Sequence, residues 1–402
     1  MLVPKLRFKR EDGTDYPEWE EKKLGSVCDS IGDGLHKAPS YDESGDYYFI
    51  NGNNLKNGKI VIEKQTPKVS VGTLQKSDKS LDTATILMSI NGTIGNLAFY
   101  QDEKIMLGKS VAYLKVSKNV CKKYIYSVLQ TRKVTDNFKL SVTGTTIKNL
   151  GLTAIRDTPI FIPCLEEQQK IADFLSTVAE VIAQSEAEVA NLQQQKKAAM
   201  QKIFSQEVRF KREDGTSYPE WENVKFGSLI KEYRDRTSIE NEDVLLSSAI
   251  SGMFLNTELF GHQRGKSNIG YLKINYGTLI LSAQNLHLGN ANVNLRFEHG
   301  IISPAYKTYH ITNCNLYFMA QWIKREKTNQ FFYNATTVGA SQCRRNVDWN
   351  ALYKQSILIP HLEEQQKIAD FLSAYDEAIS YAKQELDKWK ELKKGLLQQM
   401  FV

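Results

Sequence analysis

The sequence predicts an α+β protein in which two mixed α/β domains are separated by two long helices, paired as an antiparallel coiled coil with a pseudo-two-fold internal repeat. Two pairs of duplicated segments predict this fold. RFKREDGTDYPEWE at Arg7–Glu20 recurs as RFKREDGTSYPEWE at Arg209–Glu222, and LEEQQKIADFLS occurs at Leu165–Ser176 and again at Leu362–Ser373. The chain is therefore two consecutive units of about 200 residues.

The residues between the duplicated segments have diverged, so the copies indicate a shared frame and the interiors two specialised domains. This pattern predicts six parts: a first tag at 1–20, a first interior domain at 21–162, a central long helix at 163–205, a second tag at 206–222, a second interior domain at 223–359 and a C-terminal long helix at 360–402.

The composition is that of a globular protein, with 41% hydrophobic and 24% charged residues in 402. No apolar run of eighteen residues occurs and the N-terminus lacks a signal-peptide pattern, so we expect a soluble, cytoplasmic protein. Five cysteines without a CxxC pair disfavour a disulfide framework and structural zinc. A net charge of +6 suits a surface that meets nucleic acid, although many enzymes are equally basic.

Each unit ends in a long helical pattern whose apolar or small residues recur in alternating steps of four and three. This spacing is a heptad seam of more than four repeats, which predicts that the two helices pair as a coiled coil. Helices of roughly 35 to 40 residues would make a rod on the order of 55 to 60 Å long. The seam positions are Ile171, Leu175, Val178, Ile182, Ser185, Val189, Leu192, Lys196, Ala199 and Ile203, then Ile368, Leu372, Tyr375, Ile379, Ala382, Leu386, Trp389, Lys393, Leu396 and Met400.

The heptads leave the orientation of the helices open. A two-fold relation between the units would make them antiparallel and bring Met400 near Arg7, so that the chain is nearly a closed ring. Lys196 and Lys393 occupy equivalent seam positions, where a polar residue either restricts the register or extends to solvent at a frayed end.

Both interior domains alternate short β-rich runs with turn signals and then continue into a helix. Internal alignment places Asn91 opposite Asn285, Thr93 opposite His287, and Gly95-Asn96 opposite Gly289-Asn290. The predicted strands are Tyr47–Leu55, Ala84–Ile90 and Val111–Val116 in the first domain, and Asp243–Ile250, Gly277–Gln284 and Ala305–Ile311 in the second; the predicted helices are Lys122–Leu140 and about Leu316–Lys327.

The loops of both domains carry amide, hydroxyl, imidazole and basic side chains, which can bind the edges of bases in DNA. Each of them also has a structural explanation, since Asn and Gly favour turns and most surface Arg and Lys are simply solvated. Trp19 and Trp221 in the tags are expected to pack the frame. The candidate DNA-binding residues are His36, Lys37, Asn51, Asn53, Asn54, Asn91, Thr93, Lys109, Thr145, Thr146 and Lys148 in the first domain, and Arg264, Lys266, Gln284, Asn285, His287, Ser341, Gln342, Arg344 and Arg345 in the second.

Motifs of catalysis are missing from the sequence. It contains no glycine-rich phosphate loop, no GxSxG, no HExxH, no metal-spaced His/Cys cluster, and neither of the two motifs expected of an adenine methyltransferase. A binding protein is therefore favoured over an enzyme.

The tags, the P-LEEQQKIADFLS helix openings and the motifs DGLHKAP (Asp33–Pro39), INGNNL (Ile50–Leu55) and GTTIKNL (Gly144–Leu150) resemble the specificity subunit of Type I restriction-modification systems. The resemblance covers essentially the whole chain. It implies that each interior domain is a target-recognition domain that binds one half of an asymmetric, interrupted double-stranded DNA sequence. The second domain has GASQCRRNVDW where the first has GTTIKNL, so recognition residues cannot be carried between the domains.

The resemblance also implies partners. The long helices and their ends would dock two methyltransferase subunits, and restriction subunits that translocate DNA would join them. S-adenosylmethionine, ATP and Mg are expected in those partners and no cofactor in this chain. The alternative function is a coiled-coil adaptor whose domains bind proteins, without DNA specificity.

Overall fold

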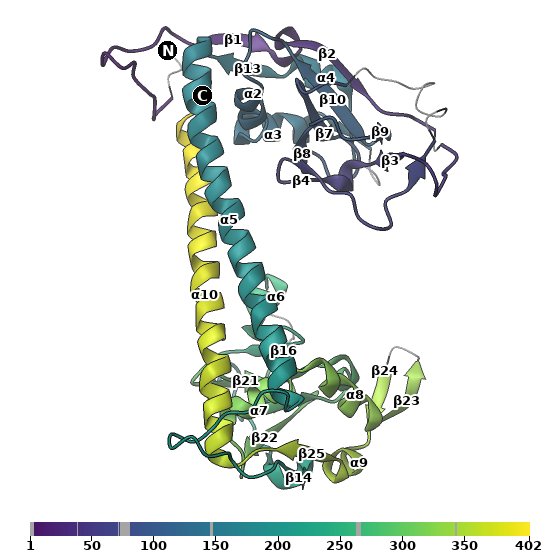
Figure 1. The fold of residues 1–402 in the computed structure, drawn as a ribbon, viewed down its shortest axis with the longest axis vertical. Helices are drawn as coiled ribbons and strands as arrows, with labels where there is room; N and C mark the ends of the chain where they lie inside the picture. The colour runs from purple at the N-terminus through teal and green to yellow at the C-terminus, as the bar shows by residue number, and fades with distance from the viewer. Residues whose placement is uncertain are drawn as a thin grey trace. The chain divides into compact units, whose positions relative to one another are not determined.

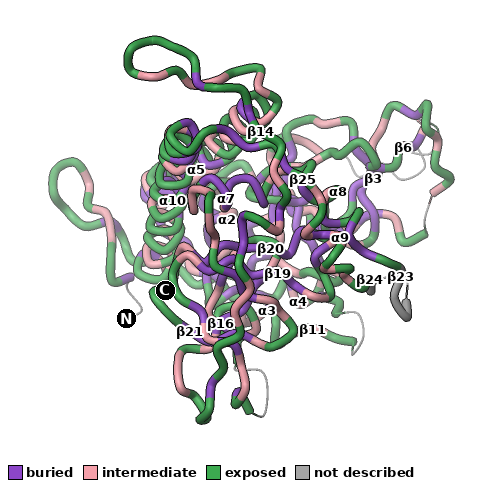
Figure 2. The backbone as a smooth tube through the Cα atoms, turned by 90° about the horizontal axis from the view of Figure 1, so that it is seen from below, coloured by how far each residue is buried: buried purple, intermediate pink, exposed green. Residues whose placement is uncertain are grey.

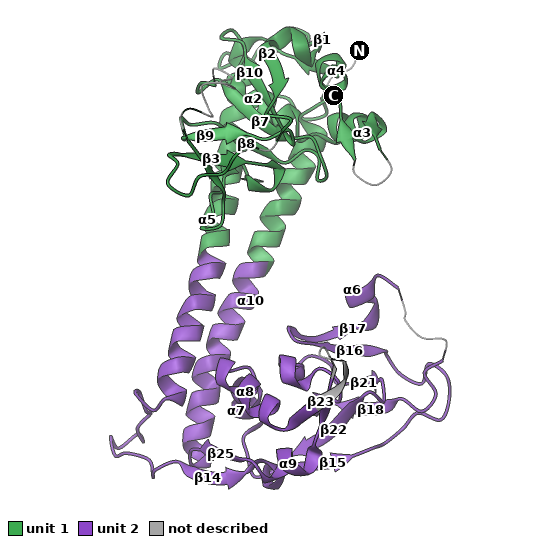
Figure 3. Cartoon of the chain, turned by 90° about the vertical axis from the view of Figure 1, so that its right-hand side faces the viewer, with its two compact units in different colours: residues 1–187, 384–402 green, residues 188–383 purple. Residues whose placement is uncertain are grey.

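The computed structural model describes residues 4–37, 39–70, 72, 81–144, 148–262, 267–341 and 344–402, with side chains described for all of these except 338–341 and 344. The chain divides into two compact units. Residues 1–187 and 384–402 form unit 1, and residues 188–383 form unit 2 (Figure 3). Both boundaries fall inside long helices, so each unit holds one interior domain and one end of each helix.

Unit 1 is built on a four-stranded antiparallel sheet in the order β2-β10-β7-β8 (Figure 1). A smaller sheet, β6-β3-β9, contains the parallel pair β3–β9, and β1 pairs with β13. The elements are β1 Glu20–Lys23, β2 Cys28–Asp33, β3 Tyr47–Ile50, β4 Leu55–Lys56, β5 Lys59–Ile60, β6 Lys68–Val69, β7 Thr85–Ser89, β8 Leu97–Phe99, β9 Ile105–Leu107, β10 Val111–Val116, α2 Lys122–Val128, α3 Arg132–Leu140, β11 Val142–Thr143, β12 Asn149–Leu150, α4 Leu152–Asp157 and β13 Pro159–Ile162, with 3-10 turns at Leu24–Val27 (η1) and Gly52–Asn54 (η2).

Unit 2 repeats this scheme with a sheet in the order β15-β22-β19-β20, while β14 pairs with β25. The elements are β14 Glu222–Lys225, β15 Ile230–Tyr233, β16 Leu246–Ala249, β17 Gly252–Leu255, α6 Asn256–Phe260, β18 Leu272–Asn275, β19 Leu279–Ser282, β20 Ala291–Val293, β21 His299–Ile302, β22 Tyr306–Ile311, α7 Leu316–Trp322, α8 Glu326–Asn334, β23 Thr336–Ser341, β24 Arg344–Val347, α9 Trp349–Lys354 and β25 Ser356–Ile359, with 3-10 turns at Phe226–Leu229 (η3) and Leu286–Leu288 (η4).

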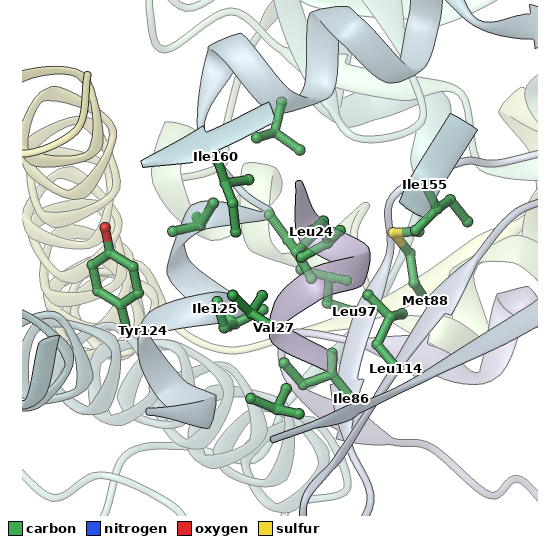
Figure 4. Packing of buried hydrophobic residues seen from close by; sticks show 14 of the residues in the cluster. Leu24, Val27, Ile86, Met88, Leu97, Leu114, Tyr124, Ile125, Ile155 and Ile160 are labelled. Atoms are coloured by element: carbon green, nitrogen blue, oxygen red, sulfur yellow. The ribbon is translucent and has the colours of Figure 1, made fainter. Parts of the chain in front are cut away.

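The central sheets are buried on both faces because successive side chains of a strand point in opposite directions. In unit 1, Ile86 and Met88 of β7 face the main core with Leu24 and Ile125 (Figure 4), whereas Leu87 lies in a second cluster on the other face. Unit 2 uses the same alternation. Leu279 and Leu281 of β19 belong to the main core and Ile280 to a separate cluster.

The long helices are α5, Leu165–Phe204, and α10, Leu362–Gln399. In unit 1, Ile171 of α5 shares a core with Met400, while Glu186 pairs with Lys390 at 2.8 Å. Residue numbers that rise along α5 therefore fall along α10, so the two segments run antiparallel.

Unit 2 shows the same order, since Ile203 shares a core with Ile368 and Lys196 pairs with Asp376 at 2.6 Å. Every predicted seam position is buried or half-buried, which confirms the heptad seam. The backbone N–H of Leu6 donates to the carbonyl of Gln399 at 2.9 Å, so residues near the two ends of the chain are neighbours in unit 1, as predicted.

Three predicted elements were wrong in extent. The helix predicted at Lys122–Leu140 is two helices, because Thr131 interrupts it: the Thr131 hydroxyl accepts the backbone N–H of Val134 and caps α3. In unit 2, α7 likewise ends at Trp322 and α8 begins at Glu326. The strand predicted over Tyr47–Leu55 ends at Ile50, where the Asn54 side chain accepts the backbone N–H of Asn51 and stabilises a turn.

Among the described residues, no helix is long and apolar enough to cross a membrane.

Candidate nucleic-acid interface

Antiparallel pairing brings the polar loops of unit 1 to one end of the central sheet. β2 ends at Asp33 opposite Ala112, and β7 ends at Ser89 opposite Val111, where β10 begins. The loops after β2 and β7 and the turn before β10 therefore leave the sheet at the same end.

Hydrogen bonds join these loops into one surface. The Asn91 amide donates to the carbonyl of Lys109 at 3.3 Å, and the Ser110 hydroxyl donates to Oδ1 of Asn51 at 3.0 Å. The loop before β12 joins them, because the N–H of Gly92 donates to the carbonyl of Lys148 at 3.0 Å.

The loop after β2 completes this surface, because Leu35 forms a bridge with Gly108. We call the surface the unit 1 loop face. The exposed predicted residues on its loops are His36, Lys37, Asn51, Asn53, Thr93, Lys109 and Lys148, with Asn91 half-buried among them.

Two predicted residues of this face are engaged within the protein. Asn54 donates its amide to the carbonyl of Val61 at 2.9 Å and accepts from the N–H of Asn51, so both ends of its side chain are used in holding the turn. His36 bonds through Nε2 to Asp33 at 2.8 Å, which leaves one ring nitrogen for another partner.

Polar loops also leave the central sheet of unit 2 at one end. β19 ends at Ser282 opposite Tyr306, where β22 begins, and the Ser282 hydroxyl accepts the N–H of Asn285 at 3.1 Å. Gln284 and Asn285 are exposed immediately after this strand. We call the loop 283–290, with the hairpin β23–β24, the unit 2 loop face.

The predicted alignment of the two loops holds at the glycines but is one residue out at the preceding strand, where Ser89 is equivalent to Ser282 and the alignment pairs it with Ala283. The N–H of Ser89 donates to the carbonyl of Asn96 in unit 1, and the N–H of Ser282 donates to the carbonyl of Asn290 in unit 2. Gly95 and Gly289 both have positive φ, +91° and +86°, in the region that glycine enters without strain. Both loops therefore end on a glycine of the same conformation, but the loop of unit 2 is one residue longer and displays different side chains.

His287 and Arg345 lie near each other on the unit 2 loop face. Burial and the neighbouring Arg345 guanidinium both lower the pKa of His287, which keeps the imidazole neutral at pH 7. Its Nδ1 is buried and has no hydrogen-bond partner among the described residues. A neutral imidazole offers one donor and one acceptor, as a reader of base edges requires.

Arg345 is held by its own hairpin. Its Nε donates to the Thr336 hydroxyl at 2.7 Å and its Nη2 to the Thr336 carbonyl at 3.0 Å, while the guanidinium lies 4.1 Å from the Tyr333 ring centre. These contacts fix the guanidinium against the start of β23 and engage its Nε and Nη2.

Several predicted residues cannot be placed. Ser341 and Arg344 belong to β23 and β24, but their side chains are not described. The predictions at Thr145, Thr146, Arg264, Lys266 and Gln342 lie outside the described residues.

The sequence interpretation missed three polar residues at these strand ends: Ser110 and Asn149 in unit 1 and Arg234 in unit 2. Ser110 and Arg234 directly adjoin strands of the central sheets at the loop-bearing end, and Asn149 is the first residue of β12 and forms a bridge with Asn91. Arg234 is exposed and bonds to Glu232 at 2.7 Å. The strand order would have identified them, but that order depends on pairings between distant residues.

A second surface repeats in both units, where each tag contacts the start of a long helix. Arg7 binds Glu167 through two hydrogen bonds, of 2.8 and 2.9 Å, and Glu167 is fully buried. These bonds raise the pKa of Arg7, so its guanidinium stays charged. Trp19 also donates to Glu167, at 3.2 Å, which confirms that this tryptophan packs the frame.

The second tag makes the same bidentate contact, with Arg209 bound to Glu364 at 3.2 and 2.9 Å. The tips of both tags are exposed loops (Figure 2). Next to each tag a phenylalanine of the long helix remains partly exposed, Phe174 by 38% and Phe371 by 40%.

These helix phenylalanines pack edge-on against Phe8 and Phe210 of the tags. We call the two pairs, Phe8 with Phe174 and Phe210 with Phe371, the helix-start surfaces. Their duplication explains why the helix openings are identical and the tags nearly so while the interiors differ, since each copy of one segment contacts a copy of the other.

The described residues contain no group of three or more His, Cys, Asp or Glu side chains that could hold a metal ion. The two loop faces offer amides, hydroxyls, imidazoles and cations, which are groups for recognition.

Comparison with known proteins agrees with this geometry. Residues 16–194 and 188–390 each match the family described as "Type I restriction modification DNA specificity domain". Two curated relatives from Methanocaldococcus jannaschii, the putative type I restriction enzyme MjaX specificity subunit and the type I restriction enzyme MjaVIII specificity subunit, are each 24% identical over 97% of this chain and 94% of their own length.

Solved structures share the fold. The S subunit of a Type I restriction-modification system from M. genitalium aligns over 100% of this chain and 99% of its own with 16% identity and a TM-score of 0.58. A chain from a structural study of complex assembly and conformational transition in a type I system aligns over 96% and 97%, with 14% identity and a TM-score of 0.53. The chain therefore belongs to the family of Type I restriction-modification DNA specificity domains, and it carries that domain twice.

Proposed function

We propose that each unit reads one half of an asymmetric, interrupted DNA sequence through its loop face. The observation that carries this proposal is that one strand order and one glycine turn display different side chains in the two units. Asn and Gln side chains suit adenine edges, while Lys and Arg suit guanine and phosphate. Two unlike faces on a common frame would select two unlike half-sites.

The paired helices would set the number of base pairs between the half-sites, as dimer geometry does in other DNA-binding proteins. The helix-start surfaces would each dock one methyltransferase subunit. A partly exposed aromatic pair at the same place in both units supports a partner that is present in two copies, because equivalent surfaces bind equivalent partners.

Catalysis would belong to the partners, so this chain would be a non-catalytic subunit working in the cytoplasm. The methyltransferase subunits would supply S-adenosylmethionine chemistry, and restriction subunits would use ATP and Mg. The chain's small positive charge supports modest DNA affinity on its own, since affinity for the phosphate backbone grows with the number of cations in contact.

Sequencing of methylated bases in cells that carry this chain with its methyltransferase subunits tests the proposal. We expect a motif with two different halves and an unread gap. Asn91→Ala on the unit 1 loop face should reduce sequence specificity at one half-site. Asn285→Ala, at the aligned position on the unit 2 loop face, should reduce it at the other half-site. A continuous or palindromic motif, or a variant that relaxes both halves equally, would contradict the proposal.

A further inference from the structure

A pocket lies in unit 2 where the end of α5, the second tag and β25 meet the segment between α7 and α8. Its volume is about 170 Å³, which suits a side chain of a partner better than a drug-sized ligand. Four of its eight lining residues are aromatic. The lining residues are Phe204, Trp221, Trp322, Arg325, Phe331 and Ser356–Leu358.

Arg325 gives this apolar pocket a cation without a counter-ion. Its Nε donates to the Trp322 carbonyl and the Thr328 hydroxyl, both at 3.3 Å. The guanidinium carbon lies 4.6 Å from the Phe204 ring centre and 4.9 Å from that of Trp322. Across the described ranges, no carboxylate lies within ion-pair distance of Arg325.

Burial lowers the pKa of Arg325 to about 10, which reports that the cation has lost part of its hydration. The stacked rings offset some of that cost. A carboxylate would offset more, because the two terminal guanidinium nitrogens can donate to its two oxygens side by side.

The equivalent place in unit 1 differs in both features. Its volume is only about 10 Å³, and Thr131 stands where unit 2 has Arg325, so that the cation at this place is the exposed Lys133. The Thr131 hydroxyl is satisfied locally, since it donates to the Val128 carbonyl at 2.7 Å. Phe161 stands in place of Leu358, and its larger side chain fills space that unit 2 leaves open.

The pocket adjoins elements of the proposed docking surface. Trp221 belongs to the tag whose Phe210 forms the second helix-start surface, and Leu358 is 41% exposed at the mouth of the pocket. An occupant with an apolar body and a carboxylate matches the aromatic wall and the unpaired cation.

We propose that this pocket anchors an aromatic or aliphatic side chain, flanked by an acidic residue, from the methyltransferase subunit bound at unit 2, and that unit 2 therefore binds its copy more tightly than unit 1. This inference rests on the proposed docking of two partner copies. Assembly then proceeds through a complex with one partner copy, bound at unit 2.

The test is titration of the full-length chain with the methyltransferase subunit, followed by calorimetry and by native mass spectrometry of the one-copy and two-copy complexes. We expect two unequal sites in the wild-type chain. Arg325→Met replaces the cation by an apolar side chain and should weaken binding at the tighter site at least ten-fold. Leu358→Trp closes the mouth from an exposed position, so folding is preserved, and should have the same effect.

Lys133→Met is the matched control, because Lys133 is the cation at the unit 1 site, 4.4 Å from the Phe161 ring centre, and is exposed. It should leave both affinities unchanged. Equal sites in the wild type, or equal weakening of both sites by Arg325→Met, would overturn the inference while leaving the proposed function intact. Absence of any binding would instead show that the proposed docking is wrong.

Discussion

The frame and the loop faces of this protein have the same duplicated origin but different physical constraints. In the frame, Arg7 binds Glu167 and Arg209 binds Glu364 with the same bidentate geometry. Each partner is itself a copied residue, so a change in one copy would leave a buried charge unpaired. The loop faces have no such internal partners for most of their side chains and were free to diverge.

Divergence of the loop faces is nevertheless limited by the turn that carries them. Gly95 and Gly289 keep the same left-handed conformation although most of the residues before them differ. The comparison separates two roles within one loop, a backbone that must be retained and side chains that can change. Three pairs of substitutions, each made at equivalent positions in the two units, test this comparison.

The largest effect is expected in the frame. Arg7→Met leaves the fully buried carboxylate of Glu167 with only the Trp19 indole as a partner, which should destabilise unit 1 by about 3 kcal/mol. Arg209→Met should cost unit 2 a similar amount. Hydrogen exchange read by mass spectrometry on peptides from each unit measures the two losses separately.

The control for this pair is Arg212→Met. Arg212 pairs with Glu363 at 3.9 Å, donates to the Ser217 carbonyl at 3.2 Å and lies over the Tyr218 ring, and because these contacts are exposed its loss should cost only about 1 kcal/mol. If the losses of stability caused by Arg7→Met and Arg209→Met differed from each other by much more than the loss caused by Arg212→Met, the two copies of the frame would not be equivalent.

The second effect concerns the glycine turn. A β-carbon at Gly95 would meet open space, so Gly95→Ala carries only the cost of positive φ, about 1 kcal/mol. A β-carbon at Gly289 would lie 2.5 Å from Oδ1 of Asn329 in α8, so Gly289→Ala should cost about 2 kcal/mol and displace the loop. Thermal unfolding measures the loss of stability, and loss of sequence specificity at one half-site of the methylation motif measures the displacement of the loop. Equal losses of stability in the two variants would mean that the two loops are packed alike.

The sequence predicted the parts of this fold that depend on local periodicity. The heptad seam places all of its residues correctly, because a coiled coil repeats one contact along the chain. The breaks at Thr131 and between α7 and α8 were missed, since apolar spacing continues across both; a single side chain caps α3 at Thr131, and no side chain caps the start of α8. Capping residues are common in loops and helices alike, so they rarely stand out in one sequence.

The sequence predicted that polar loops form the candidate site, but it did not identify all of the residues on those loops. Asn91 and Lys109 were found because polar residues follow or precede β-rich runs, and the structure brings them within hydrogen-bond distance. Asn149 and Arg234 were missed because their place depends on which strands are neighbours, a long-range property. The pocket around Arg325 had no sequence signal, because its walls come from four segments distant in the chain.

The smallest changes in stability are expected for the two seam lysines, and they should have opposite signs. Lys196 is paired with Asp376, which also accepts from the Gln321 amide at 2.8 Å, so Lys196→Met should destabilise unit 2 by up to about 1 kcal/mol. The Lys393 ammonium donates to the side-chain oxygen of Gln130 at 3.1 Å, and burial lowers the pKa of Lys393. Removing that half-buried cation should stabilise unit 1 by about 0.5 to 1 kcal/mol, after allowance for partial exposure.

The pH dependence separates this explanation from simple packing. Because the folded-state pKa of Lys393 lies below its ordinary value of 10.5, the unfolded chain binds more protons between those two values, and the stability of the wild type rises with pH through that window. The cost of burying the charge is therefore fully present at neutral pH and disappears as pH rises toward 10.5. Lys393→Met should accordingly stabilise unit 1 most at pH 7 and progressively less at alkaline pH, measured by urea unfolding of the two proteins at matched pH. A gain that does not change with pH would assign the effect to packing of the methionine, and Lys393 would then be equivalent to Lys196 as an ordinary seam position.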